Sequence, residues 1–403
     1  MTASPETAAV AITGVGILTP LGDTVASVME ALCAGHSSVA PIQDPASAGK
    51  SSFPDFEATR YANVRGMRIY NRTTRLGICA TRLALVDAGL EDTGFPSQHL
   101  GVLMASTFGH FDTLIEYDRS LHTLGPARTN PALMPLAIPS APGAVIALSF
   151  GAKACSITLA DGGVGALDAL GLAARLTRAG RVGACIVVAA LGLFDELILS
   201  ASRAGQLAPP NEFRVFDQRS GGTAFGEAAV AVIVETMAHA RARGASPKGF
   251  VAGQASTFAA SPECLGEFLT RACSQALSKA GVAPSSLGLV SSGANGLQAV
   301  DQAEAHALLS VLGESSEQPG VTAVKAALGD TLDASGLIQT VVAMSSLAGT
   351  PAPPIARLGQ AAHPGLHYLT EPSPVQQGHA LITGTSQTGA CSAVVISRDA
   401  RAD

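Results

Sequence analysis

Cysteine and histidine are the side chains most often used as nucleophiles and general bases, and in this chain both types are scattered. The 403 residues include 9 histidines and 7 cysteines, namely Cys33, Cys79, Cys155, Cys185, Cys264, Cys273 and Cys391. The cysteine count is odd and no CxxC pair occurs, so neither a disulfide framework nor a zinc site is predicted. Cys155 and Cys391 fall in strand-like apolar runs, and we interpret both as buried structural residues rather than nucleophiles.

The histidines also lack a partner at metal-ligand spacing. His110 and His122 flank a mixed segment without such a partner, and His306 falls on an expected helix, where a surface or packing role is the simpler interpretation. His363 and His367 lie in a loop rich in proline and glycine, which indicates solvated side chains. We therefore expect no metal ion and no cofactor.

A turn between a strand and a helix is the clearest place for chemistry. Residues 155–160 read as a strand and residues 164–178 as a helix, and the turn between them contains glycines, an aspartate and alanine. The unpaired N–H groups of a helix start stabilise an anionic nucleophile such as a thiolate. Neither Ala160 nor Gly163 can attack a carbonyl carbon, so this turn has a suitable position but no nucleophile there.

Composition excludes several function classes. The chain has 25 basic and 31 acidic residues without a basic block, so nucleic-acid binding is not predicted. No uncharged apolar run reaches the roughly 18 residues of a membrane span, and we expect no membrane association. The first ten residues contain Glu6 and lack the basic start of a signal peptide, so a reduced, cytoplasmic setting is the expectation.

The order of expected elements predicts an α/β protein. Residues 155–160, 164–178 and 184–190 form a strand–helix–strand unit, which implies parallel strands. Strands and helices alternate again after residue 250, and two α/β halves, residues 1–245 and 246–403, fit best. Strands are also expected near the start and end of the chain, at residues 10–13, 101–105, 228–235, 287–291, 381–383 and 392–396. The remaining expected helices are residues 24–34, 76–88, 265–280, 301–312 and 336–348, whereas residues 37–75 read as irregular.

Four segments carry motifs in an order that is typical of one protein family. The most specific is Phe-Asp-Gln-Arg-Ser-Gly-Gly-Thr-Ala-Phe-Gly-Glu at residues 216–227, which resembles the signature Phe-Asp-x-x-Arg-x-Gly…Gly-Glu of the β-ketoacyl synthase family, part of the thiolase superfamily. The others are the opening strand and turn at residues 11–22, the segment 324–330 that resembles a Lys-x-x-x-Gly-His motif, and the proline turn at residues 351–354. The resemblance covers nearly the whole chain and implies a thiolase-like five-layer α/β/α/β/α sandwich of two related halves.

The resemblance also implies where the family's catalytic Cys and two His residues would fall. The helix register places the Cys at Gly163, whereas a count from the preceding strand gives Ala160. The first His falls at Asn295 and the second at Asp330, and Lys325 and Glu304 are retained. A carboxylate at Asp330 would repel a malonyl carboxylate and disfavour an enolate. The site is therefore expected to be degenerate, and Lys325 and Glu304 to form a buried charge pair or hydrogen-bond hub.

Homologues without the Cys include the chain-length factors of type II polyketide systems, which this chain is similar to in residues 167–170 and in a shortened loop near Asn295. That resemblance implies a subunit without catalysis of its own, paired with a catalytic ketosynthase and working on an acyl carrier protein. Its role would be to shape the acyl tunnel during decarboxylative condensation of malonyl units. Candidate tunnel or interface residues come from segment 109–135 and are Phe111, Leu114, Ile115, Tyr117, Leu121, Leu133 and Met134.

Two other functions stay open at this point. One is a homodimeric protein that binds an acyl thioester or an acyl carrier protein without a condensing partner. The other is a catalyst, such as a hydrolase, that uses a different residue. A plain core role is as good an interpretation as tunnel lining for any single residue of segment 109–135.

Overall fold

The computed structural model describes residues 9–39, 50–53, 56–91, 96–209, 212–313 and 317–400. Within them a ten-stranded sheet has the order β10-β9-β11-β12-β8-β1-β7-β5-β3-β4. Its strands are β1 (Val10–Leu18), β3 (Leu100–Ala105), β4 (Cys155–Leu159), β5 (Ala184–Leu191), β7 (Ala228–Thr236), β8 (Gly249–Phe258), β9 (Leu287–Ser291), β10 (Gly320–Thr322), β11 (His379–Thr385) and β12 (Ala390–Ser397). The short strands β2 (Lys50–Ser51) and β6 (Phe225–Gly226) form a separate parallel pair.

The large sheet consists of two five-stranded parts with the same pattern. In the first part β4, β3 and β5 are parallel to one another. Strand β7 pairs with β5 in the antiparallel direction, and β1 pairs with β7 in the same way. In the second part β10, β9 and β11 are parallel to one another. Strand β12 pairs with β11 in the antiparallel direction, and β8 pairs with β12 in the same way. The two parts join only through β1 and β8, at the pairs Ala11↔Phe250 and Ile12↔Gly249. The two halves thus have one shared topology, and the division at residue 245 stays a prediction.

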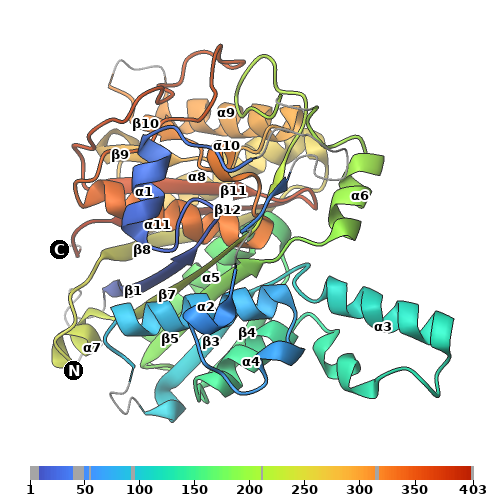
Figure 1. The fold of residues 1–403 in the computed structure, drawn as a ribbon. Helices are drawn as coiled ribbons and strands as arrows, with labels where there is room; N and C mark the ends of the chain where they lie inside the picture. Colours follow the sequence, from blue (N-terminus) through green and yellow to red (C-terminus); the bar gives the residue numbers. More distant parts are fainter. Residues whose placement is uncertain are drawn as a thin grey trace.

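Helices form three layers around the two parts of the sheet. The α-helices are α1 (Val25–Cys33), α2 (Arg72–Asp87), α3 (Phe111–Leu124), α4 (Ala141–Ser149), α5 (Gly165–Arg178), α6 (Asp195–Arg203), α7 (Met237–Ala242), α8 (Leu265–Ala280), α9 (Gln298–Leu312), α10 (Lys325–Leu328) and α11 (Ser335–Leu347). Helices α2 and α4 pack on the first part of the sheet, and α8, backed by α9, packs on the second. Helices α5 and α11 contact strands of both parts and each other (Figure 1). The expected thiolase-like five-layer sandwich is therefore confirmed.

Short 3₁₀ helices connect several of these elements. They are η2 (Ala58–Arg60), η3 (Met67–Ile69), η4 (Ser97–His99), η5 (Pro131–Leu136), η6 (Gly162–Val164), η7 (Pro262–Cys264), η8 (Pro284–Ser286) and η9 (Leu332–Ala334). Two of them, η6 and η9, lie directly before the central helices α5 and α11 and contact one another. The starts of the two central helices therefore meet, which brings distant parts of the sequence to one place.

The structure corrects several expected elements. Strand β4 was expected to be buried, but it is the last strand of its sheet and its residues are half-buried or exposed. Helix α2 begins at Arg72 rather than at residue 76, because the Asn71 side chain caps it by accepting a hydrogen bond from Thr74 N at 2.9 Å. Helices α4 and α6 and strands β8 and β10 had not been expected. Part of the segment predicted to be irregular, residues 40–49 and 54–55, lies outside the described residues.

Segment 109–135 forms an arm that projects from the body of the protein (Figure 1). Its parts are α3 and η5, which pack against each other. Thr113 is the one fully buried residue of α3, and no residue of η5 is buried. None of the described helices is both long and apolar enough to cross a membrane.

Glycines allow one outer helix in each half to approach its strand closely. A Cβ added at Gly16 in β1 would lie 2.0 Å from the Ala80 carbonyl oxygen of α2. A Cβ added at Gly253 in β8 would lie 2.2 Å from the Ala276 carbonyl oxygen of α8. Backbone oxygens cannot move away as a flexible side chain could, so both helices depend on the missing side chain.

We predict that Gly16→Ala and Gly253→Ala each lower the free energy of unfolding by about 2 kcal/mol or more, because the helix must move away from the sheet. Gly378→Ala is the matched control, since its added Cβ would meet only a terminal nitrogen of Arg398, at 3.8 Å. Urea unfolding followed by circular dichroism measures all three. Equal stability of Gly16→Ala and Gly378→Ala would contradict the close helix–strand contact.

Candidate functional site

The turn that carries Gly163 lies at the start of α5, against the end of β11. Gly162 has a φ of +63°, and its N–H donates to Thr107 Oγ1 at 2.9 Å. A Cβ added at Gly162 would lie 2.4 Å from Ser386 Oγ, and one added at Gly163 would lie 3.1 Å from the Thr385 carbonyl oxygen. The turn therefore leaves little room for a side chain. Ala160 is exposed at the end of β4. Whether Gly163 or Ala160 corresponds to the family's Cys stays a prediction.

Three of the expected site residues form one buried cluster. The Asn295 Nδ2 group donates to Asp330 Oδ2 at 2.8 Å, and Lys325 Nζ lies 3.2 Å from Asp330 Oδ1. All three residues are buried. Asn295 comes from the loop after β9, whereas Lys325 begins α10 and Asp330 follows it. The Asp330 backbone also bonds with Ala224 O and Gly226 N, which ties the cluster to the segment that carries the family signature.

Asp330 is ionised in this cluster. Burial alone would raise the pKa of its carboxyl group, but the Lys325 charge and the hydrogen bond from Asn295 outweigh it, so the pKa lies below its ordinary value. The Leu332 N–H and the Ser335 hydroxyl donate further hydrogen bonds to Asp330 Oδ1, at 3.0 and 3.2 Å. A fixed carboxylate at this point can neither stabilise an enolate oxygen nor accept a second carboxylate nearby.

Glu304 lies beside this cluster but is not the ion-pair partner of Lys325. Its Oε2 atom accepts hydrogen bonds from Ser292 Oγ at 2.9 Å and Thr383 Oγ1 at 2.5 Å. Burial raises the pKa of Glu304, and the two hydroxyl groups and the Lys325 charge offset only part of that effect. Lys325 thus pairs with Asp330, whereas Glu304 is held by hydroxyl groups on β11 and after β9.

Two buried aspartates that sequence reasoning missed hold the loops around the cluster. Asp333 Oδ2 accepts a hydrogen bond from Thr107 N, and its Oδ1 accepts one from Thr107 Oγ1, both at 2.8 Å. Because Thr107 Oγ1 also accepts from Gly162 N, Asp333 links α11 with the Gly163 turn and with the loop before the arm. Burial is the largest effect on Asp333 and raises its pKa to about 6.

The second missed aspartate is Asp301, in the first turn of α9. Its Oδ1 accepts from Asn295 N at 2.9 Å and Gly296 N at 3.0 Å, and its Oδ2 accepts from Phe216 N at 2.7 Å. Phe216 has a φ of +58°, a strained value for a residue with a side chain, and Asp301 fixes it there. Burial raises the pKa of Asp301 to about 6. An acidic residue in a first helical turn was the available sequence signal.

The signature residues brace the fold around the site. Asp217 accepts hydrogen bonds from Gly359 N at 2.6 Å and Gln360 N at 3.2 Å, which fixes the loop after the proline turn. Glu227, at the end of the signature, pairs with Arg72 Nε at 2.6 Å and accepts from Leu193 N at 3.2 Å. All of these contacts are structural, so the signature residues hold loops and strands together around the cluster.

The candidate tunnel residues are not brought to this cluster. They lie along the projecting arm, where their side chains are half-buried or exposed in this chain: Phe111, Leu114, Ile115, Tyr117, Leu121, Leu133 and Met134. At the base of the arm the Phe111 ring packs on His110, with ring centroids 4.8 Å apart. Tunnel lining and interface roles for these residues stay predictions.

No alternative nucleophile or metal site stands out in the described residues. Burial raises the pKa of the Cys155 thiol, and it raises that of Cys391 to about 12, so neither favours the reactive thiolate. Within the described part of the chain, no group of three or more His, Cys, Asp and Glu side chains could hold a metal ion. His110 is buried and lies at the base of the arm rather than in a set of ligands.

Two family descriptions match most of this chain. The family description "Beta-ketoacyl synthase, N-terminal domain" matches residues 7–240, and "Beta-ketoacyl synthase, C-terminal domain" matches residues 248–358. The chain therefore belongs to the β-ketoacyl synthase family.

Individual relatives are similar over most of their length. A "3-oxoacyl-[acyl-carrier-protein] synthase 2" from Synechocystis sp. is 28% identical, over 88% of this chain and 89% of the relative. The "Tetracenomycin polyketide synthase ketoacyl synthase beta subunit" from Streptomyces glaucescens is 30% identical, over 97% of this chain and 98% of the relative. Among solved structures, "The ishigamide ketosynthase/chain length factor" has a TM-score of 0.89 at 22% identity, covering 97% and 99% of the two chains, which shows a shared fold.

We predict that Lys325→Met lowers the free energy of unfolding by about 3 kcal/mol, because it leaves the Asp330 carboxylate buried without a counter-charge. Adding Asp330→Asn should recover more than half of that loss. Lys248→Met is the control, since Lys248 forms a partly exposed pair with Asp87 at 3.1 Å and should change stability by less than about 1 kcal/mol. Strictly additive losses in the double variant, measured by urea unfolding, would contradict the pairing.

The raised pKa values of Asp301 and Asp333 predict how stability depends on pH. Each carboxyl group takes up a proton at higher pH when folded than when unfolded, so it stabilises the fold as the pH falls from 7 to 5, by about 1 kcal/mol. Histidines whose pKa is lowered by burial act in the opposite direction, so the wild-type protein is compared with Asp301→Asn and Asp333→Asn at each pH. The free energy of unfolding of the wild type, minus that of each variant, should be larger at pH 5 than at pH 7. A constant difference would refute the raised pKa values.

Proposed function

We propose that the chain is a chain-length factor, a subunit without its own condensing activity that pairs with a catalytic ketosynthase. The observation that carries this proposal is the state of the three catalytic positions. Gly163 has no side chain, and Asn295 and Asp330 are bonded to each other, with Lys325 neutralising the carboxylate. The scaffold around these positions is nevertheless complete, from the signature braces to the central helices.

A second line of support comes from the relatives. The Streptomyces glaucescens relative is by its name the beta subunit of a polyketide synthase, and it matches this chain from end to end. The Synechocystis relative is by its name a synthase acting on an acyl carrier protein. Because Gly163 offers no nucleophile, the Streptomyces glaucescens relative is the better guide to function than the Synechocystis synthase. The same feature argues against a condensing enzyme that works alone.

The partner would meet this chain at the β4 edge of the sheet. An edge strand offers unpaired backbone N–H and C=O groups, and β4 can extend its sheet by pairing with a strand of another chain. The neighbouring helix α4 carries Leu148, whose side chain is 84% exposed, and the arm carries exposed Leu114 and Met134. An exposed apolar surface next to an open sheet edge is typical of a subunit interface.

In this proposal the partner supplies the nucleophile and the condensation of malonyl units delivered on an acyl carrier protein. This chain contributes interface area, and its arm helps to shape the tunnel that receives the growing chain. The limit on chain length is steric, because a bulky side chain at the tunnel end clashes with further extension. A homodimer that binds an acyl thioester would use the same edge, so the two functions differ in the partner they choose.

We predict that Leu148→Glu abolishes a one-to-one complex with the catalytic ketosynthase and the condensing activity that depends on it, because it places a charge in an apolar interface. Val86→Glu on α2 is the matched control, since Val86 is 51% exposed and lies on a helix that packs mainly on β1, β7 and β5. Co-expression followed by size-exclusion chromatography and a condensation assay gives both readouts. A wild-type chain that forms a homodimer and leaves the ketosynthase unaffected would refute the proposal.

A further inference from the structure

A large cavity lies at the seam between the two parts of the sheet, and the degenerate site does not account for it. Strand β8 pairs with β1 only as far as Phe250 and from there pairs with β12 alone. Ala252 is an extra residue of β8 in the pairing with β12. The cavity has a volume of about 1050 Å³ and is lined by β8, the ends of α5 and α8, and residues 397–400. We call it the seam trough. It extends along the second half of the 14-residue helix α5 to Arg178, which lies roughly 20 Å from Gly163 along the helix.

Cationic side chains converge on the seam trough from three elements. Arg175 and Arg178 come from the end of α5, Lys279 from the end of α8, and Arg398 from the segment after β12. Among the described residues that line the trough, the acidic one is Asp399, which pairs with Arg398 at 3.2 Å. The whole chain has a formal charge of −6, so this group of positive charges stands against the overall balance.

Two of the cations on facing walls are held in place by one residue of β8. Gln254 Oε1 accepts a hydrogen bond from Arg175 Nη1 at 3.1 Å, and the Gln254 carbonyl oxygen accepts one from Lys279 Nζ at 3.0 Å. The Gln254 amide is itself fixed, because its Nε2 donates to Asp168 Oδ1 at 3.0 Å. Within the described part of the chain, the exposed Arg178 side chain has no hydrogen bond or ion pair. Arg175 and Lys279 are therefore positioned before any ligand arrives, whereas Arg178 is left to bind it.

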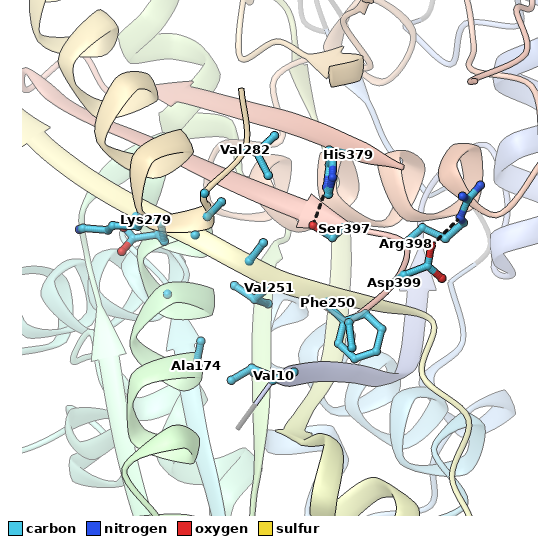
Figure 2. Close-up of a pocket in the computed structure, with 18 of the residues that line it drawn as sticks. Val10, Ala174, Phe250, Val251, Lys279, Val282, His379, Ser397, Arg398 and Asp399 are labelled. Atoms are coloured by element: carbon cyan, nitrogen blue, oxygen red, sulfur yellow. Dashed lines mark hydrogen bonds and ion pairs between the residues drawn. The ribbon is translucent and has the colours of Figure 1, made fainter. Parts of the chain in front are cut away.

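The wall between the cations is apolar. Figure 2 shows Lys279 and Arg398 at opposite ends of the trough, with Val251 and Phe250 between them and Val10 below. Cations in the last turns of α5 and α8 also offset the helix dipoles. That effect explains neither Arg398, which lies outside any helix, nor the apolar wall that all the cations surround.

We propose that the seam trough binds an amphipathic organic phosphate, a small molecule with a multiply charged phosphate head and an apolar body. The head would bind Arg178 with Lys279 and Arg175, because phosphate oxygens accept several charge-assisted hydrogen bonds at once. The body would cover Val251 and Phe250 and remove their apolar surface from water. A simple inorganic anion would leave the apolar wall bare, and a fatty acid would leave most of the cations unmatched. This binding is independent of the chain-length role, since the trough and the β4 edge are formed by different elements.

The test is isothermal titration of the full chain, alone and in complex with its ketosynthase, with geranyl diphosphate and with inorganic pyrophosphate at 0.15 M salt. Geranyl diphosphate should bind about tenfold or more tightly than pyrophosphate, because only it covers the apolar wall. Arg178→Glu and Lys279→Glu should each weaken its binding about tenfold or more. Arg181→Glu is the control, since Arg181 is exposed near the end of α5 but does not line the trough, and binding should stay unchanged.

Three results would overturn the proposal. They are no binding of geranyl diphosphate at millimolar concentration, equal affinities for the two probes, and equal weakening by Arg181→Glu and Arg178→Glu. Thermal unfolding of each variant without ligand checks that the fold is intact. If Leu148→Glu abolishes the partner complex but leaves geranyl diphosphate binding unchanged, the two proposals have been tested separately.

Discussion

The buried ion pair between Lys325 and Asp330 organises the candidate site. Asp330 joins Lys325 to Asn295 through its side chain, and its backbone bonds to both sides of the signature segment. A lysine buried at this depth needs a counter-charge, because an unpaired ammonium group in an apolar interior is strongly destabilising. The Asp330 carboxylate supplies that charge. If Asp330 stands where the family has a histidine, as the motif predicts, the residue that would end catalysis also stabilises the scaffold.

From this cluster the constraint spreads through buried hydrogen bonds. Asp333 lies three residues after Asp330 and holds Thr107, which in turn holds the Gly162 turn and leads into the arm. Asp301 holds the Asn295 loop and the strained Phe216. Buried hydrogen bonds thus connect the base of the arm to the cluster of Asn295, Lys325 and Asp330, although the arm residues themselves lie far out on the surface. This arrangement suits a subunit that presents a fixed shape to a partner.

Much of this could be predicted from the sequence because the informative residues lie in motifs. The strand–helix–strand unit around Gly163 and the positions of Asn295, Lys325 and Asp330 follow from local patterns. Strand β8 was missed because Gly249, Gly253 and the polar residues after it lack an apolar alternation. The exposure of β4 was missed because an apolar edge strand that pairs with another chain has the same composition as a buried one. The pairing of Lys325 with Asp330, and the roles of Asp301 and Asp333, depend on contacts across the fold, which local sequence does not contain.

The central claim is that this chain supports condensation without carrying any covalent intermediate. Intact-protein mass spectrometry tests it on the complex of the chain with its ketosynthase, after incubation with an acyl carrier protein that bears an acyl thioester. The account predicts that the ketosynthase subunit gains the mass of the acyl group while this chain keeps its unmodified mass. It also predicts that the ketosynthase alone makes no product. An acyl group found on this chain, or full condensing activity without it, would contradict the account.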